Sequence, residues 1–428
     1  MKLFVGIAFI LTYVLIIIFS RHKHIITGIS ALIIGGVALC FGTTTFSGLL
    51  GAIDLNVVMV LVGIMLTVGM FTESEMPSKI ADRLISKIPS TMWALTLLSI
   101  LAGVVSAFID NVATVLMFAP IGIAVARKTK VSPVPAIICI AVSSNLQGAA
   151  TLVGDTTSVM LGSFAGLSFS EFFLLNGKLS IFFVVELGAL ATIPILLFVF
   201  RKNNGKLEYE SENVVVKEYF STVALLLNIV CLVALSFFNI DFKYLNGVVC
   251  MAFGVVTLVV CTLIRKSDPI KSCKEGVDYK TVLFLVFLFV IIGVVSEVGI
   301  IDDLSNLFVK IGSNNVFLLY TIIVFGSVIL SAFIDNIPYV ATMLPVIKGL
   351  CATMTVASPY LFYFGLLVGA TLGGNLTPVG ASANVVGMGI LEKDGEKATA
   401  KDFFKIGVPM TLTAVLVGYV MLWLIWGM

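Results

Sequence analysis

Charged side chains are scarce in this 428-residue chain: Asp, Glu, Lys and Arg make up 12% of it, against about 25% in soluble domains. Hydrophobic residues make up 59%. A water-soluble fold could not bury so much apolar surface, so the shortage of charge excludes a soluble protein and indicates a polytopic protein of the lipid bilayer. The net charge of +2 gives no sign of a nucleic-acid partner.

Histidine is rare, and cysteine occurs without pairing. His22 and His24 flank Lys23 in a short polar stretch between two apolar runs, which is interpreted as a juxtamembrane loop rather than a metal site. The seven cysteines form no CxxC pair and have no ligand spacing, so they are interpreted as small apolar residues. The sequence shows no nucleophile–base pair and no metal-ligand group. We therefore expect no enzyme activity and no cofactor besides Na+ or H+ as a coupling ion.

Long apolar runs are what the chain has instead. Crossing a hydrocarbon core of ~30 Å takes about 20 helical residues. Runs of this kind fall near 3–19, 25–42, 55–73, 177–200, 219–238, 245–264, 280–298 and 404–427. Residues 78–88 and 300–311 mix charged and apolar positions, and they are expected to be short helices at the membrane interface.

One hexapeptide occurs twice. Ser-Ala-Phe-Ile-Asp-Asn stands at 106–111 and again at 331–336, each time near the middle of an apolar stretch, 92–127 or 315–350. An acid at membrane depth is costly and is usually functional. Because no turn-rich loop separates the two arms, each stretch is predicted to be a re-entrant hairpin. Two full spans with the Asp-Asn pair in an aqueous loop are the alternative.

Two more apolar stretches, 133–166 and 358–391, are broken by glycine and polar residues and are predicted to be single broken crossings. The landmarks follow in the same order in both halves. The predicted fold is therefore all-α, with two inverted repeats of five transmembrane helices each, over 1–200 and 219–428, and a cytoplasmic linker over 201–218. Each repeat contains one re-entrant hairpin and one broken helix.

The distribution of positive charge predicts the orientation. Cytoplasmic loops carry an excess of lysine and arginine. In the predicted topology one side holds five of the 26 Lys and Arg residues and the other side holds the rest; the five are Lys2, Lys178, Lys243, Lys310 and Lys348. The rich side is then cytoplasmic, and both termini are extracytoplasmic. The hairpins enter a cell membrane from opposite sides.

Two hairpin tips and two broken helices predict one site at the midplane, since irregular backbone at that depth must be buried or line a cavity. Half-helix N-termini suit anions, whereas carboxylates and carbonyls suit Na+ or H+. The candidate ion ligands are Asp110, Asn111, Asp335, Asn336 and Asp155, the first four as a Na+ site. The candidate substrate ligands are Thr151, Gly154, Thr156, Thr157, Asn375, Thr377, Gly380, Ser382 and Asn384.

Two alternatives stay open for these residues. Asp and Asn are favoured helix N-caps, so the Asp-Asn pairs could cap helices with no further role. The hydroxyl and amide side chains could satisfy only the backbone groups that the helix breaks set free.

No lysine or arginine falls inside the predicted core segments, so the predicted site contains three carboxylates and no basic side chain. Protonation or bound cations must then compensate the charge of those carboxylates. This favours transport of a cation, a neutral solute, or an anion that binds together with Na+ or H+. It disfavours a dedicated anion channel.

The segments Ser106–Pro120, Thr151–Asp155, Ser331–Pro345, Gly369–Asn384 and Lys401–Lys405 resemble the ion transporter superfamily. The resemblance is to its arsenite permease/sodium–proton antiporter/P-protein branch, often called citrate-transporter-like. It implies scaffold and transport domains each built from both repeats, a homodimer, and elevator-type alternating access. It also implies ion binding at the two hairpin tips.

The chain departs from this family in the first break. Where members often read Asn-Ile-Gly-Gly and Gly-Asp-Pro-Pro-Asn, the chain has Asn-Leu-Gln-Gly at 145–148 and Gly-Asp-Thr-Thr-Ser at 154–158. Three functions are weighed. The expected one is ion-coupled secondary active transport of a small anion or oxyacid, such as arsenite or a carboxylate. A Na+/H+ antiporter and an ion channel are the alternatives.

Overall fold

The computed structural model describes residues 1–19, 22–203, 205, 214–238, 240, 242–312, 315–354 and 358–427. Half of the predicted linker over 201–218, namely residues 204 and 206–213, lies outside the described residues. The helices of the first half are α1 (Lys2–Ile18), α2 (Lys23–Cys40), α3 (Phe46–Gly51), α4 (Leu55–Glu73), α5 (Met76–Ile85), α6 (Thr91–Ser106), α7 (Asn111–Lys128), α8 (Val134–Gln147), α9 (Thr156–Ala165), α10 (Ile181–Leu190) and α11 (Ile193–Phe200).

The helices of the second half are α12 (Phe220–Leu235), α13 (Leu245–Arg265), α14 (Pro269–Gly276), α15 (Tyr279–Glu297), α16 (Ile300–Gly312), α17 (Val316–Ser331), α18 (Asn336–Met354), α19 (Tyr360–Leu367), α20 (Ser382–Lys393) and α21 (Ala400–Trp426). The strands of the described residues are one antiparallel pair, β1 (Leu174–Leu175) and β2 (Lys178–Leu179). The predicted all-α membrane architecture is confirmed. The short helices α3 and α14 and the strand pair were not predicted.

Eight helical segments of the described residues are long and apolar enough to cross a membrane; they are α2, α4, α7, α10 with α11, α13, α15, α18 and α21. This set includes α7 and α18, the second arms of the two predicted hairpins. Helix length alone therefore does not separate a re-entrant arm from a full span. The burial of the hairpin tips, described below, bears on this distinction.

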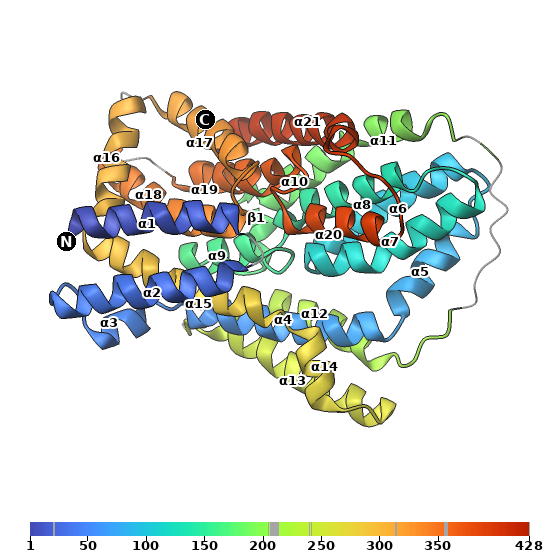
Figure 1. Cartoon of the computed structure of the whole chain (residues 1–428), viewed down its shortest axis with the longest axis horizontal. Coiled ribbons are helices and arrows are strands. Elements are labelled where there is room, and N and C mark those ends of the chain that lie inside the picture. Colours follow the sequence, from blue (N-terminus) through green and yellow to red (C-terminus); the bar gives the residue numbers. More distant parts are fainter. Residues whose placement is uncertain are drawn as a thin grey trace.

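The helices form two groups that differ in their packing partners. In the first helix group, α4 packs on α13 and α2 packs on α15, with α1 and α12 beside them. In the second helix group, α6 and α7 pack on α8, α20 packs on α7 and α8, α10 and α19 pack on α21, α17 and α18 pack on α19, and α9 packs on α18. Figure 1 shows α4, α12, α13 and α15 in the lower part of the molecule and α6, α8, α10 and α21 above them. Each group contains helices from both halves of the chain.

The two halves repeat one order of elements. α6 ends at Ser106 and α7 begins at Asn111, and α17 ends at Ser331 and α18 begins at Asn336. The helices α4 and α15 also start alike, because Asp54 Oδ1 accepts a hydrogen bond from the Val57 amide (3.1 Å) and Asp278 Oδ1 accepts one from the Lys280 amide (3.1 Å). The inversion of the halves in the membrane, and the homodimer, stay predictions.

Close backbone contact joins α4 to α13. A Cβ added to Gly254 would lie 2.6 Å from the Gly63 carbonyl oxygen, and one added to Gly63 would overlap the Cys250 carbonyl group. Glycine on both helices therefore lets the backbones touch, which is the usual way that membrane helices associate without a hydrophobic driving force. This pair gives the first helix group a rigid centre.

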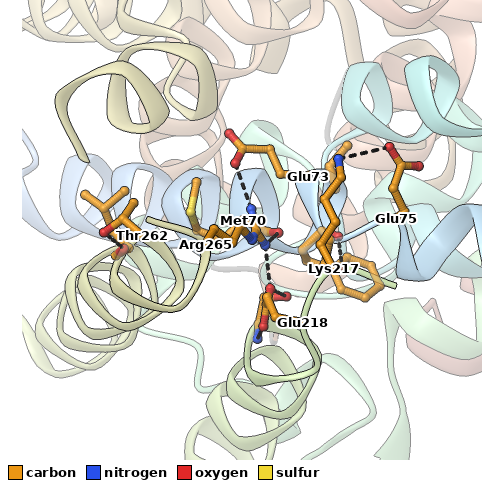
Figure 2. A network of polar contacts seen from close by, with 12 residues as sticks. Met70, Glu73, Glu75, Lys217, Glu218, Thr262 and Arg265 are labelled. Carbon is orange, nitrogen blue, oxygen red and sulfur yellow. Dashed lines mark hydrogen bonds and ion pairs between the residues drawn. The ribbon is translucent and has the colours of Figure 1, made fainter. Parts of the chain in front are cut away.

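Arg265 closes the same helix pair at its end (Figure 2). Its guanidinium donates to Glu73 Oε2 (2.7 Å) and to the Met70 carbonyl (2.8 Å), and it also pairs with Glu218. Burial alone would raise the pKa of Glu218, but hydrogen bonds from Ser221 and Arg265 hold its net pKa below the ordinary value of 4.5. The network ties the start of the second half to the end of α4.

Replacing Arg265 by glutamine should therefore destabilise the protein by about 3–5 kcal/mol, because the buried Glu218 carboxylate loses its partner. Apparent melting temperature in detergent measures the change. Lys271→Gln, in an exposed pair with Glu275, is the matched control and should change stability by about 0.5 kcal/mol or less. The lowered pKa stabilises the fold above about pH 4.5 and stops doing so as the pH falls further, so the two proteins should converge in acid. Equal melting temperatures at neutral pH would contradict this role.

Candidate functional site

A cavity of about 390 Å³ lies between the two helix groups. Its lining comes from α2, α4, α14 and α15 on one side and from α7, α8, α9, α18 and α20 on the other. The exposed residues Glu275 and Asp278 mark its mouth, on the side predicted to be cytoplasmic. At the opposite end of α4, Ser163 of α9 donates to Asp54 Oδ2 (2.6 Å) and accepts from Asn56 Nδ2 (3.3 Å). The two helix groups are therefore hydrogen-bonded to each other at the end away from this mouth.

Both hairpin tips reach the cavity. Asp110, Asn111, Asp335 and Asn336 all line it, and the two asparagines are each only 7% exposed. These two tip asparagines thus lie in the protein interior. Non-helical backbone at membrane depth requires such a position. The burial supports the re-entrant interpretation of the two hairpins.

The two tip aspartates also cap their helices. Asp110 Oδ2 accepts hydrogen bonds from the amides of Val112 (3.0 Å) and Ala113 (3.2 Å), and Asp335 Oδ1 accepts one from the Ile337 amide (3.2 Å). The capping alternative is thus present in both halves. Capping uses only one oxygen of each carboxylate. Asp110 Oδ1 takes no part in the cap, and Asp335 Oδ2 pairs with Lys23 instead.

The asparagine of each tip is hydrogen-bonded to the serine of its own hexapeptide, and Asn111 is also bonded to the helix behind it. Ser106 Oγ donates to Asn111 Oδ1 (2.9 Å), and Asn111 Nδ2 donates to Asn145 Oδ1 on α8 (2.9 Å). In the second half, Ser331 Oγ donates to Asn336 Oδ1 (2.6 Å). The shared hexapeptide therefore contributes its serine and asparagine as a fixed pair in both halves.

A threonine from each helix break bonds to the backbone of its own hairpin tip. Thr151 donates to the Ala107 carbonyl, and Thr377 donates to the Ala332 carbonyl. Glycine lets the backbone of the break lie against the backbone of the tip, since a Cβ on Gly154 would lie 2.6 Å from the Ala107 oxygen. These corresponding contacts give the site a pseudo-symmetric frame.

Hydrogen bonds join the helix break of the first half to the helix break of the second half. Asn145 Nδ2 donates to the Thr371 carbonyl (2.9 Å), and Asn375 Nδ2 donates to the Val142 carbonyl (3.1 Å). Thr157 donates to Asp155 Oδ2 (2.8 Å) and lies 2.9 Å from the Thr371 hydroxyl. The second half has no carboxylate that corresponds to Asp155, because Ala381 occupies that position.

The predicted site residues divide into two sets. The cavity is lined by Asp110, Asn111, Asp155, Thr156, Asp335, Asn336 and Ser382. The others lie behind this lining. Thr157 bonds to the side chains of Asp155 and Thr371, and the rest bond or pack against backbone; they are Thr151, Gly154, Asn375, Thr377, Gly380 and Asn384. For this second set the geometry supports the alternative of satisfying freed backbone groups.

Lys23 corrects one expectation, that the site contains no basic side chain. It is the first residue of α2, and its Nζ lies 2.5 Å from Asp335 Oδ2 and 4.9 Å from the centre of the Phe284 ring. A juxtamembrane loop was predicted there because Lys23 follows the first apolar run. The helix instead begins at this residue, and the side chain of Lys23 lines the cavity.

Two buried oxygens of the second break have no donor among the described residues, Asn375 Oδ1 and Asn384 Oδ1. Both side chains are fully buried. An unsatisfied acceptor at such depth is costly unless something binds it. Amide oxygens of this kind are suitable ligands for a small hard cation.

The fold and the sequence can now be compared with known proteins. A sequence profile of the citrate transporter family (CitMHS) matches residues 13–369. An uncharacterized transporter of Mycobacterium tuberculosis is 30% identical over 383 residues, which cover 87% of this chain and 86% of that protein. The P protein of Mus musculus is 25% identical over 492 residues, which cover 95% of this chain and 58% of that protein.

Solved structures are similar in fold. The crystal structure of the YdaH transporter of Alcanivorax borkumensis has a TM-score of 0.62 at 14% identity and covers 89% of this chain and 88% of its own. MtrF of Neisseria gonorrhoeae, described as one of a class of antimetabolite efflux pumps, has a TM-score of 0.58 at 13% identity, with 91% and 84% covered. The resemblance inferred from the sequence is confirmed. The chain is a multi-pass membrane transporter that belongs to the citrate transporter family.

Proposed function

We propose that the protein is a secondary active transporter that moves a small anion or oxyacid together with Na+ or H+. The observation that carries the proposal is the meeting of both hairpin tips and both helix breaks at one cavity between two helix groups. Polar groups concentrated at such a place within apolar sequence are expected to bind what the protein carries.

The cation is assigned to the tips. Asp110, Asn111, Asp335 and Asn336 supply carboxylate and amide oxygens, and Asp155 adds a third carboxylate beside them. Oxygen ligands of this kind suit Na+, and the carboxylates could bind a proton instead. The unpaired oxygens of Asn375 and Asn384 favour a cation nearby.

The anion is assigned to helix N-termini. α9 and α20 both begin at the cavity, with Thr156 and Ser382 in its lining, and neither has a side-chain hydrogen bond at its N-cap. Free amides and the positive end of the helix dipole attract anions. Citrate, which gives the family its description, and arsenite are the first substrates to test.

Movement is assigned to the second helix group. The cavity lies between that group and the first, which contact each other directly where α4 packs on α7 and α9 and where α15 packs on α18. An elevator in which the second group slides along the first would carry the tips and breaks together. A Na+/H+ antiporter is the second candidate, since carboxylates outnumber basic side chains in the described lining of the cavity.

Reconstitution in proteoliposomes tests the proposal. Uptake of labelled citrate, succinate and arsenite is measured with a Na+ gradient, a proton gradient, or neither. An ion-coupled carrier should accumulate one of these solutes, saturably, only when a gradient is present. An internal pH change on addition of Na+ alone would favour the antiporter. Solute flux that neither saturates nor responds to a gradient would contradict both and indicate a channel.

A further inference from the structure

Lys23 spans the cavity from one helix group to the other. Its backbone belongs to α2 in the first helix group, where Phe284 of α15 lies against its ammonium group. Its partner Asp335 is at the tip of the second hairpin, in the second helix group. The lysine side chain is 15% exposed and the aspartate side chain is 23% exposed, so water screens this pair only in part.

The charges around the pair are unbalanced. Among the described lining residues Lys23 is the single basic side chain, against six carboxylates: Glu73, Asp110, Asp155, Glu275, Asp278 and Asp335. Arg265 neutralises Glu73 from behind. The excess of carboxylates therefore attracts a second cation into the cavity. At the second tip, this cation meets the carboxylate oxygen of Asp335 that Lys23 already holds.

We propose that Lys23 is a tethered cation that holds Asp335 in the cation-free carrier and competes with Na+ for that carboxylate. The inference rests on the proposed ion site and adds a regulator to it. Both cations need the same oxygen, Asp335 Oδ2, which lies 2.5 Å from the lysine nitrogen. The lysine stem is flexible and its ammonium is a compact point charge, so it can leave the carboxylate without disturbing α2.

Displacement has a direct consequence for the substrate. When Na+ binds Asp335, the freed ammonium remains within the cavity, because its backbone is fixed at the start of α2. It is then the basic group available to pair with an anion. The cation must accordingly bind first, which would couple the two solutes through one side chain.

The experiment compares purified wild-type protein with Lys23→Met by Na+-dependent thermal stabilisation at fixed pH and fixed ionic strength, with choline chloride replacing NaCl. Removing the competing ammonium should tighten apparent Na+ binding about tenfold, since hydrogen bonds to charged groups are the stronger ones. Lys23→Gln should shift binding in the same direction, and Lys23→Arg should bind Na+ as the wild type does or more weakly. Lys2→Met, in an exposed pair with Asp303 at the start of α1, is the matched control and should leave Na+ binding unchanged.

The outcomes separate this inference from the proposed function. Unchanged or weaker Na+ binding in both Lys23→Met and Lys23→Gln overturns the competition. If Na+ shifts the melting temperature of neither the wild type nor the variants, the competition is overturned as well. Proton-driven uptake in proteoliposomes would then still support the carrier. Tighter Na+ binding in the uncharged variants together with no ion-coupled uptake would support the competition and contradict the proposed function.

Discussion

Ion-driven uptake is expected to fall about 10- to 100-fold in Asp110→Asn and in Asp335→Asn, the loss that corresponds to removing one charged ligand worth about 1.5–3 kcal/mol. Asparagine is as good a helix N-cap as aspartate and has nearly the same shape. The substitution therefore preserves the caps of α7 and α18 and removes only the charge. Initial rates in proteoliposomes at a fixed gradient measure the effect.

This choice of substitution separates the two interpretations of the tips. If the aspartates act only as caps, both variants should transport normally. Asp303→Asn, at an exposed aspartate of α16 paired with Lys2, is the matched control and should transport as the wild type does. Full activity of both tip variants would contradict the assignment of the ion site.

The second large effect is expected at the glycines where each helix break touches its hairpin tip. A Cβ on Gly154 would lie 2.6 Å from the Ala107 oxygen, and one on Gly380 would lie 2.7 Å from the Ala332 oxygen. Backbone cannot yield as a flexible side chain does, so Gly154→Ala and Gly380→Ala should each destabilise the protein by about 1–3 kcal/mol. Transport should fall at least about tenfold, because small displacements of binding groups are costly.

Gly326→Ala is the control for this prediction. Gly326 lies in α17, in the second hairpin itself, and a Cβ there would meet nothing within 4 Å. Alanine is also the better helix former, so this variant should be as stable as the wild type or slightly more so. Melting temperature and uptake are measured on the same preparations. Normal uptake in both Gly154→Ala and Gly380→Ala would show that the tips tolerate displacement.

The sequence predicted the hairpins and the broken helices because polar residues and glycine stand out against an apolar background. Asp110 and Asp335 were found as site residues for that reason, and the structure brings both to one cavity. Whether an individual residue of a break faces the cavity could not be predicted. An irregular segment has no period that assigns side chains to faces, so Thr156 and Thr157 could not be told apart.

Lys23 escaped prediction for a different reason. Near the end of an apolar run, a lysine in water and a lysine beside a cavity have the same sequence surroundings. The difference depends on where the start of α2 packs. That is set by tertiary contacts with residues far away in the sequence, such as the contact of Lys23 with Phe284. Arg265 is similar: its position at a helix end was evident, but Glu73 and Glu218 as its partners were not.

The threonine bonds from the helix breaks to the hairpin tips bear on the kind of motion that can open the cavity. Thr151 is bound to the Ala107 carbonyl and Thr377 to the Ala332 carbonyl, so neither tip can lift like a flap without losing a buried hydrogen bond. Asn111, held by Asn145, adds a second restraint in the first half. Each tip and its break form a single mechanical part. A movement that opens the cavity and keeps these bonds would displace that whole part, with the ligand geometry carried along unchanged.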